Sequence, residues 1–116
     1  MLFVDKYRLK TLLNTLEIEL KKNNLWNDIT PSSDQLLSKQ PFCCDTLLFE
    51  QWLQFVFIST LNTLITQANI SVFNCNIYPM ADESFKYLKR KPIALMNTIK
   101  ALDLILSSGQ INECTP

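Results

Sequence analysis

Apolar side chains recur at helical spacing in separate stretches of this chain. The first stretch places leucines four, three and four residues apart, which puts them on one face of a helix: Leu9, Leu13, Leu16 and Leu20. We expect this helix from about Lys6 to Lys22. Asp5 is positioned to cap its first turn, and Asn23 with Asn24 should end it.

The second stretch is the most apolar part of the chain. It predicts a helix from about Leu48 to Thr66, with large side chains almost back to back: Trp52, Leu53, Phe55, Val56, Phe57 and Ile58. A helix with so little polar surface is typically central in a fold. The sequence therefore predicts that the other helices enclose it.

Two prolines begin the remaining helices, because proline suits the first turn, where an amide proton is not needed. Pro79 opens a helix whose apolar face is Ala81, Phe85 and Leu88. Pro92 opens the last helix, which Gly109 should end, with an apolar face of Leu95, Met96, Ile99, Leu102, Ile105 and Leu106. Together these helices predict one all-α domain over residues 1–116, an antiparallel up-and-down four-helix bundle.

The connections also carry signals. The long first one, Leu25–Asp45, should be ordered, with a capping box between Ser32 and Gln35 and anchors at Trp26, Leu36 and Phe42. In the second, Gln67–Tyr78, apolar and small residues alternate, so a short extended piece is an open alternative, although no partner strand is evident.

Composition excludes several classes of function. The chain has 116 residues, with 11 basic and 11 acidic side chains, so it has no long-range field to attract nucleic acid or an anionic membrane. Its single glycine argues against a phosphate-binding loop. The chain contains no histidine, which removes the commonest general base and metal ligand. We expect no cofactor and no metal.

The cysteines show no metal-type spacing: Cys43, Cys44, Cys75 and Cys114. We expect buried thiols in a reducing cytoplasm, because the N-terminus does not read as a signal peptide and no apolar run is long enough for a membrane span.

Several short motifs resemble those of the YqcC-like family of small bacterial proteins. They are Trp26, Pro31, Leu36, Ser38, Gln40-Pro41-Phe42, Asp45-Thr46, Trp52-Leu53-Gln54-Phe55, Met80-Ala81 and Leu102-Asp103. The chain departs from the family pattern at Gln51, where glutamate usually precedes the tryptophan, and at Ser59, where proline is frequent. The resemblance implies a helical bundle of unestablished function, sometimes labelled tRNA pseudouridine synthase C.

Catalysis is not what the residues indicate. A pseudouridine synthase needs a nucleophilic aspartate in a large mixed sheet, whereas Asp28, Asp45 and Asp82 lie near predicted loops and helix starts, where capping is the usual role. Cys43 and Cys44 precede a helix, so a reactive thiol is an alternative, but small buried hydrophobic side chains are the simpler interpretation.

A basic cluster precedes the last helix and contains an aromatic residue: Lys86, Tyr87, Lys89, Arg90 and Lys91. Such a cluster could hold phosphates and stack a base. The simpler interpretation is a solvated helix end, where cations favour the negative end of the helix dipole.

A possible partner groove involves Phe42, Asp45, Trp52, Gln54 and Tyr78. Its alternative is ordinary core packing, with Gln54 tying the loop around Asp45 to the second helix. The sequence favours a non-catalytic binding or accessory protein acting through an unknown protein partner, or through a homodimer. The alternative is an RNA-associated accessory factor that meets tRNA or a tRNA-modifying enzyme.

Overall fold

The computed structural model describes residues 3–67, 70 and 72–108. These residues form helices and connections, and none of them forms a β-strand, which confirms the all-α class. In chain order the elements are α1 (Lys6–Lys22), α2 (Ser33–Leu36), η1 (Pro41–Cys43), α3 (Phe49–Trp52), η2 (Leu53–Ile58), α4 (Ser59–Ile65), α5 (Tyr78–Ser84) and α6 (Ile93–Ser108).

Helix α1 has the ends that the sequence predicts. The Asp5 carboxylate accepts hydrogen bonds from the N–H groups of Tyr7 at 3.1 Å and Arg8 at 3.2 Å. At the other end Asn24 adopts a left-handed conformation, with φ of 59°. This conformation lets the Leu25 N–H reach back to the Leu20 carbonyl at 2.8 Å and close the last turn.

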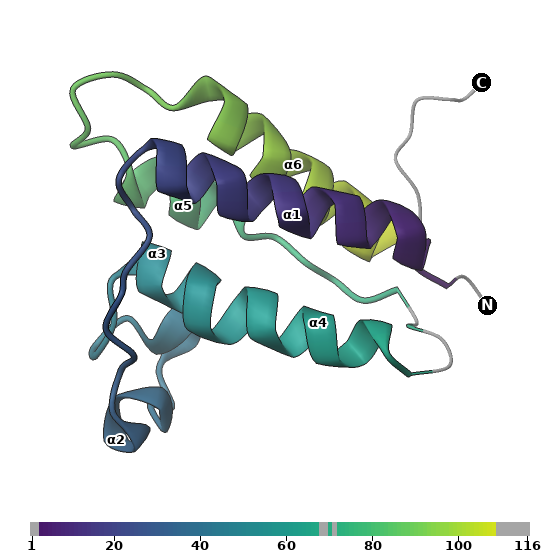
Figure 1. Cartoon of the computed structure of the whole chain (residues 1–116), viewed down its shortest axis with the longest axis horizontal. Helices are drawn as coiled ribbons and strands as arrows, with labels where there is room; N and C mark the ends of the chain where they lie inside the picture. Colours follow the sequence, from purple (N-terminus) through teal and green to yellow (C-terminus); the bar gives the residue numbers. More distant parts are fainter. Residues whose placement is uncertain (1–2, 68–69, 71, 109–116) are drawn as a thin grey trace.

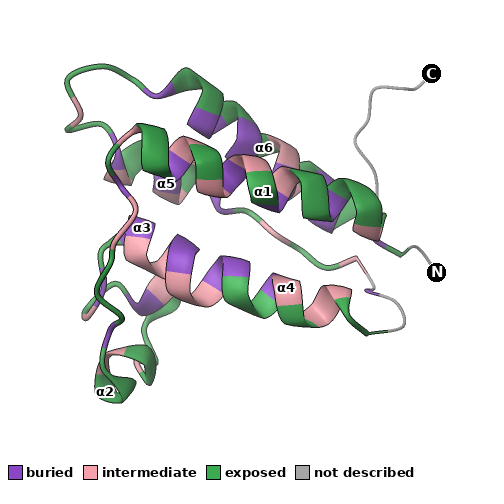
Figure 2. Ribbon diagram, viewed as in Figure 1, coloured by how far each residue is buried: buried purple, intermediate pink, exposed green. Residues whose placement is uncertain are grey.

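The centre of the core lies between α1 and α6, which run side by side in Figure 1. Apart from Leu53, the most completely buried large side chains all belong to these two helices. In Figure 2 buried and exposed positions alternate around both helices, as expected for helices that bury one face. The apolar faces predicted for both helices are therefore confirmed.

The prediction that the stretch around Trp52 is an enclosed central helix is wrong. Elements α3, η2 and α4 do follow one another without a break from Phe49 to Ile65. However, Trp52, Phe55 and Val56 are only half-buried. Apolar composition does not distinguish a helix that is buried all round from one that is buried on one side only. Here one side belongs to the core, through Phe49, Leu53, Phe57, Ile58 and Leu61, and the other is left partly open.

Helix α5 is short but well anchored. Pro79 lies in its first turn, Ala81 is fully buried and Phe85 is 2% exposed, as the sequence predicts. The Phe85 ring meets that of Phe49 edge to face, with 5.7 Å between centroids, so α5 joins α3 to the core.

The predicted extended piece has one backbone contact with the segment before α1. The carbonyl of Ile70 accepts a hydrogen bond from the Val4 N–H at 2.7 Å. The chain then returns beneath α1 towards α5, as Figure 1 shows.

In the first connection the capping box of Ser32 and Gln35 is confirmed. Trp26 and Phe42 pack against the core, but Leu36 does not and is 36% exposed. Its expected anchoring role falls instead to polar groups, because the Thr46 hydroxyl donates to the Gln35 carbonyl at 2.7 Å.

Cys43 is buried and Cys75 half-buried, whereas Cys44 is exposed, so the expectation of buried thiols is wrong at Cys44. The predicted cap at Gly109 and the fourth cysteine, Cys114, lie outside the described residues. Within the described ranges, no helix is both long and apolar enough to cross a bilayer.

Candidate functional site

An apolar groove of about 330 Å³ runs along the exposed side of the Phe49–Ile65 helix. One wall is the helix itself, and the other is the returning chain from Phe73 to Ile77. The helical wall consists of Trp52, Val56, Phe57, Thr60, Leu61 and Leu64. Steps of three and four residues bring these side chains to one side of the helix.

A cluster of aromatic rings closes one end of the groove. The Phe42 ring lies edge to face on Trp52, with 4.9 Å between centroids, and Trp52 lies 5.4 Å from Phe57. Phe49 stacks behind Trp52 at 5.8 Å. Such contacts stabilise ring positions beyond simple burial, so this end of the groove is preformed.

Phe42 reaches this position through an unusual backbone conformation. Phe42 and Cys43 have φ angles of 57° and 52°, in the left-handed region that bulky residues avoid. The Cys44 N–H closes the turn on the Pro41 carbonyl at 3.1 Å. Each such residue costs on the order of 1–3 kcal/mol, and strain of this kind is concentrated at functional sites.

The other wall is attached to α6 through Asp103. Its carboxylate accepts hydrogen bonds from the N–H groups of Ile77 and Tyr78, both at 2.8 Å, and so fixes the start of α5. The Cys75 thiol donates to the same carboxylate at 3.3 Å. Burial, together with this carboxylate, raises the pKa of Cys75 to about 12, so the thiol is protonated and inert at neutral pH.

Gln54 belongs to the scaffold and not to the groove lining. The Asn27 N–H donates to its Oε1 at 2.7 Å, and its Nε2 donates to the Asn27 carbonyl at 2.8 Å. The expected tie to the Asp45 loop is therefore wrong, because Asp45 instead accepts a hydrogen bond from the Ser38 hydroxyl. Gln54 lies in the π-helical segment η2, a rare distortion often found near functional sites.

The structure brings only part of the predicted groove together. Phe42 and Trp52 line it, but Asp45, Gln54 and Tyr78 do not. The Tyr78 ring instead lies under the Lys100 ammonium, 5.6 Å from its centroid. Sequence reasoning missed the wall from Phe73 to Ile77, for which the alternation noted in that connection was the available signal.

Glu50 is a second residue that sequence reasoning missed. It is 9% exposed, and its carboxylate takes part in no hydrogen bond or ion pair within the described part of the chain. It lies in the first turn of α3, where the helix dipole favours a negative charge. Burial and the charge of Glu50 raise the pKa of Tyr87. The sequence feature that could have indicated Glu50 is a single carboxylate within an apolar stretch.

The predicted basic cluster lies in the connection from α5 to α6. Two of its cations are in surface ion pairs, Lys86 with Glu83 at 2.8 Å and Lys91 with Asp82 at 3.3 Å. The hydrogen bond to Glu83 raises the pKa of Lys86. Tyr87 is 65% exposed, and Lys89 and Arg90 are exposed as well.

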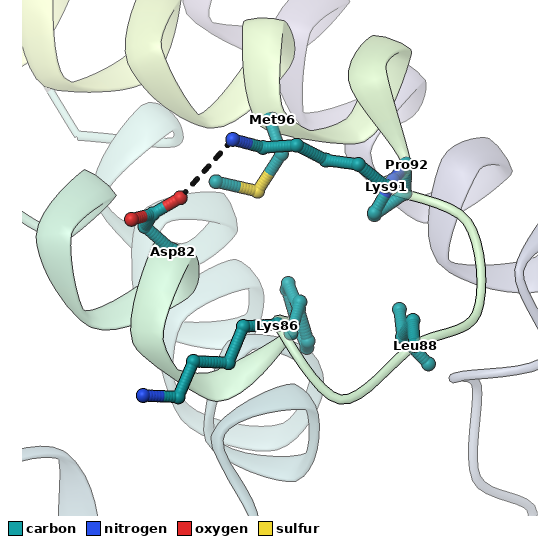
Figure 3. Close-up of a pocket in the computed structure, with 7 residues that line it drawn as sticks. Asp82, Lys86, Leu88, Lys91, Pro92 and Met96 are labelled. Atoms are coloured by element: carbon teal, nitrogen blue, oxygen red, sulfur yellow. Dashed lines mark ion pairs between the residues drawn. The ribbon is translucent and has the colours of Figure 1, made fainter.

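A small pocket of about 180 Å³ lies inside this connection. Figure 3 shows Lys91 reaching over it to Asp82, above Met96, while the Lys86 ammonium points away. The ion pair covers an otherwise apolar hollow lined by Phe85, Leu88 and Pro92. The cations of the cluster therefore do not converge on one point.

Comparisons with known proteins place this small all-α protein in a family. The family model DUF446, described as tRNA pseudouridine synthase C, matches residues 8–105. The chain belongs to this family.

The relatives divide into uncharacterised proteins and an enzyme. The chain is 30% identical over 105 residues to an uncharacterised protein of Haemophilus influenzae, covering 90% of this chain and 95% of that protein. It is 36% identical over 61 residues to the uncharacterised protein YqcC of Escherichia coli, covering 53% of this chain and 54% of that protein.

A shorter match is to the tRNA pseudouridine synthase C of Pectobacterium carotovorum. The identity there is 32% over 50 residues, 43% of this chain but only 13% of that protein. No solved structure matches the chain. The predicted resemblance to YqcC-like proteins is thus confirmed.

Proposed function

We propose that this protein is a non-catalytic binding or accessory protein of the bacterial cytoplasm that acts by protein–protein contact through the groove. The observation that carries the proposal is the groove itself, an apolar channel with a preformed aromatic end. The proposal includes the arrangement predicted from the sequence, an antiparallel up-and-down four-helix bundle, as the frame that holds the groove.

Strain supports a binding role for the groove. The chain adopts two unfavourable backbone conformations in succession at Phe42 and Cys43, and the result is an aromatic ring at the groove end. Half-buried Trp52 beside it adds the side-chain type most enriched at binding hot spots. The strained backbone costs folding free energy, and the groove leaves apolar surface exposed. Both features are more typical of a binding site for another molecule than of ordinary core packing.

The non-catalytic part of the proposal rests on how the acidic groups are used. Asp45 is bonded to Ser38, and Asp82 is paired with Lys91. No cluster of three or more potential metal-ligating side chains occurs among the residues described. The enzyme relative shares only 13% of its length with this chain, so its name does not carry its activity over.

Affinity capture with surface variants tests this proposal. Thr60 is exposed on the groove wall, and Ile18 is 54% exposed on α1 outside it. We expect Thr60→Lys to abolish capture of partners from the native host, because a charge in the groove would have to be desolvated. Ile18→Lys should leave capture unchanged. Equal capture by both variants would overturn the proposal.

A second candidate function is an RNA-associated accessory role in tRNA modification. It is favoured by the exposed Tyr87, followed by exposed Lys89 and Arg90, and by the name that the family model carries. Lys89→Gln with Arg90→Gln should weaken a tRNA gel shift at low salt. The matched control neutralises Lys10 and Lys39 elsewhere. Absence of any shift at low salt would dispose of this candidate.

A further inference from the structure

The hollow in the connection from α5 to α6 is separate from the groove, because the two share no lining residue. Its volume is about 180 Å³, and its inner surface is apolar. Phe85 is 2% exposed and Met96 is 3% exposed, and Leu88 and Pro92 also line it. An apolar cavity of about 150 Å³ is enough to hold benzene. The hollow therefore has room for one aromatic ring, but not for a helix or a folded partner.

The side chains of the hollow suit an aromatic ligand. A ring gains favourable contacts with the edge or face of another ring and with a thioether sulfur. Phe85 supplies a ring and Met96 supplies a thioether. In Figure 3 the Met96 side chain lies beneath the Lys91 ammonium, at the mouth of the hollow.

The mouth of the hollow is spanned by an ion pair that can open. The Lys91 ammonium lies 3.3 Å from the Asp82 carboxylate, and the two side chains are 62% and 55% exposed. An exposed pair of this kind contributes little to stability, because both groups are well hydrated when they are apart. The pair therefore covers the hollow without sealing it. It also shows where Lys91 can hold a carboxylate.

The charge near the mouth favours an anionic ligand group over a cationic one. From Asp82 to Lys91 the chain carries four cations and two anions, a net charge of +2. The two anions are both in ion pairs, whereas Lys89 and Arg90 are exposed and take part in none within the described residues. A carboxylate is attracted to this region, whereas an amine is repelled.

We propose that the hollow binds a small aromatic carboxylate, in which one ring is joined to the carboxylate by a short chain. The ring enters the hollow against Phe85 and Met96, where it loses contact with water. The carboxylate takes the place of Asp82 on the Lys91 ammonium, and the Asp82 side chain turns to solvent. Because the site lies outside the groove, the proposal goes beyond the protein-binding function proposed above and is tested independently of it.

Titration with 3-phenylpropionate, followed by two-dimensional NMR of the full chain, tests the proposal. We expect a dissociation constant on the order of 1 mM, with the largest amide shifts at Phe85, Leu88 and Met96. The alcohol and the amine of the same skeleton, 3-phenylpropanol and 3-phenylpropylamine, should bind at least about fivefold more weakly. The absence of saturable shifts, shifts that map to the groove, or an amine that binds as tightly as the acid would overturn the proposal.

Variants at the mouth test how the carboxylate is held. Asp82→Asn frees the Lys91 ammonium and should tighten 3-phenylpropionate binding severalfold. Glu83→Gln makes the same change in charge outside the hollow and should tighten binding clearly less. Lys91→Gln, at an exposed position, should abolish the preference for the acid over the alcohol. Equal effects of Asp82→Asn and Glu83→Gln would refute the exchange of carboxylates.

Variants within the hollow test where the ring lies. Leu88→Trp enlarges a half-buried side chain that lines the hollow and should abolish binding of the acid and the alcohol alike. The control is Leu104→Trp, at a position of α6 that is 46% exposed and outside the hollow, which should leave both affinities unchanged. Unchanged binding in Leu88→Trp would refute this site.

Discussion

The two sides of this molecule use their apolar residues differently. Between α1 and α6, leucines and isoleucines at regular spacing are buried almost completely. The Phe49–Ile65 helix buries one side in the same core, but Trp52 and Val56 are left half-buried at a groove. The most apolar segment of the chain is therefore not the most buried one. The difference is between a closed core and an apolar groove that stays open at the surface.

The largest expected effect is in the core between α1 and α6. Leu102→Ala should lower the free energy of unfolding by about 2–5 kcal/mol, because it leaves a cavity where the side chain is fully buried. Leu64→Ala, at the half-buried groove wall, should cost clearly less. Chemical denaturation of both variants checks the comparison. Equal losses of unfolding free energy would show that the groove wall is packed as tightly as the core between α1 and α6.

The next effect concerns the scaffold under the groove. Gln54→Leu leaves the N–H and C=O groups of Asn27 without their partners, which should cost about 1–3 kcal/mol of unfolding free energy. The control is Gln40→Leu, at an exposed position without a side-chain hydrogen bond. If urea denaturation shows no difference between the two, the bond to Asn27 does not hold the first connection in place.

A smaller effect is expected at the second wall. Asp103→Asn weakens the two charge-assisted hydrogen bonds to the start of α5, at a cost of about 1 kcal/mol or more. Glu83→Gln removes only an exposed ion pair and should change stability by less than about 0.5 kcal/mol. Thermal unfolding of both variants measures the difference. A larger loss in Glu83→Gln would contradict the role given to Asp103.

The last effect, a pH dependence at the same wall, is absent at neutral pH and develops only in alkaline solution. The folded-state pKa of Cys75 is raised from 9.0 to about 12, so between these values the unfolded chain releases a proton that the folded chain keeps. Stability should therefore fall as pH rises above about 9, and less so in Cys75→Ser. At neutral pH an alkylating reagent should label exposed Cys44 before Cys75. Identical pH profiles would refute this account of the thiol.

Much of the fold could be predicted from the sequence, because its signals are local. Caps at Asp5 and Ser32, the proline at 79 and the leucine spacing in α1 each depend on residues within a turn or two. What depends on distant contacts could not be predicted. The wall from Phe73 to Ile77 exists only because Asp103 and Ser107 are brought beside it by α6.

The sequence also predicted only some of the residues of the candidate site. Aromatic residues at the start of the apolar helix indicated Phe42 and Trp52, which lie together. Polar residues near them in sequence, Asp45 and Gln54, point to other partners. Spacing in the sequence shows which residues share one side of a helix. It does not show which side packs against a distant segment such as Phe73–Ile77.

Site-specific photo-cross-linking in the native host tests the central claim most directly, namely that contacts are made at the groove. A photoreactive residue at Thr60, exposed on the groove wall, should give cross-linked protein adducts. The same residue at Thr11, exposed on α1 outside the groove, should give none. Adducts from Thr11 with none from Thr60 would contradict the claim.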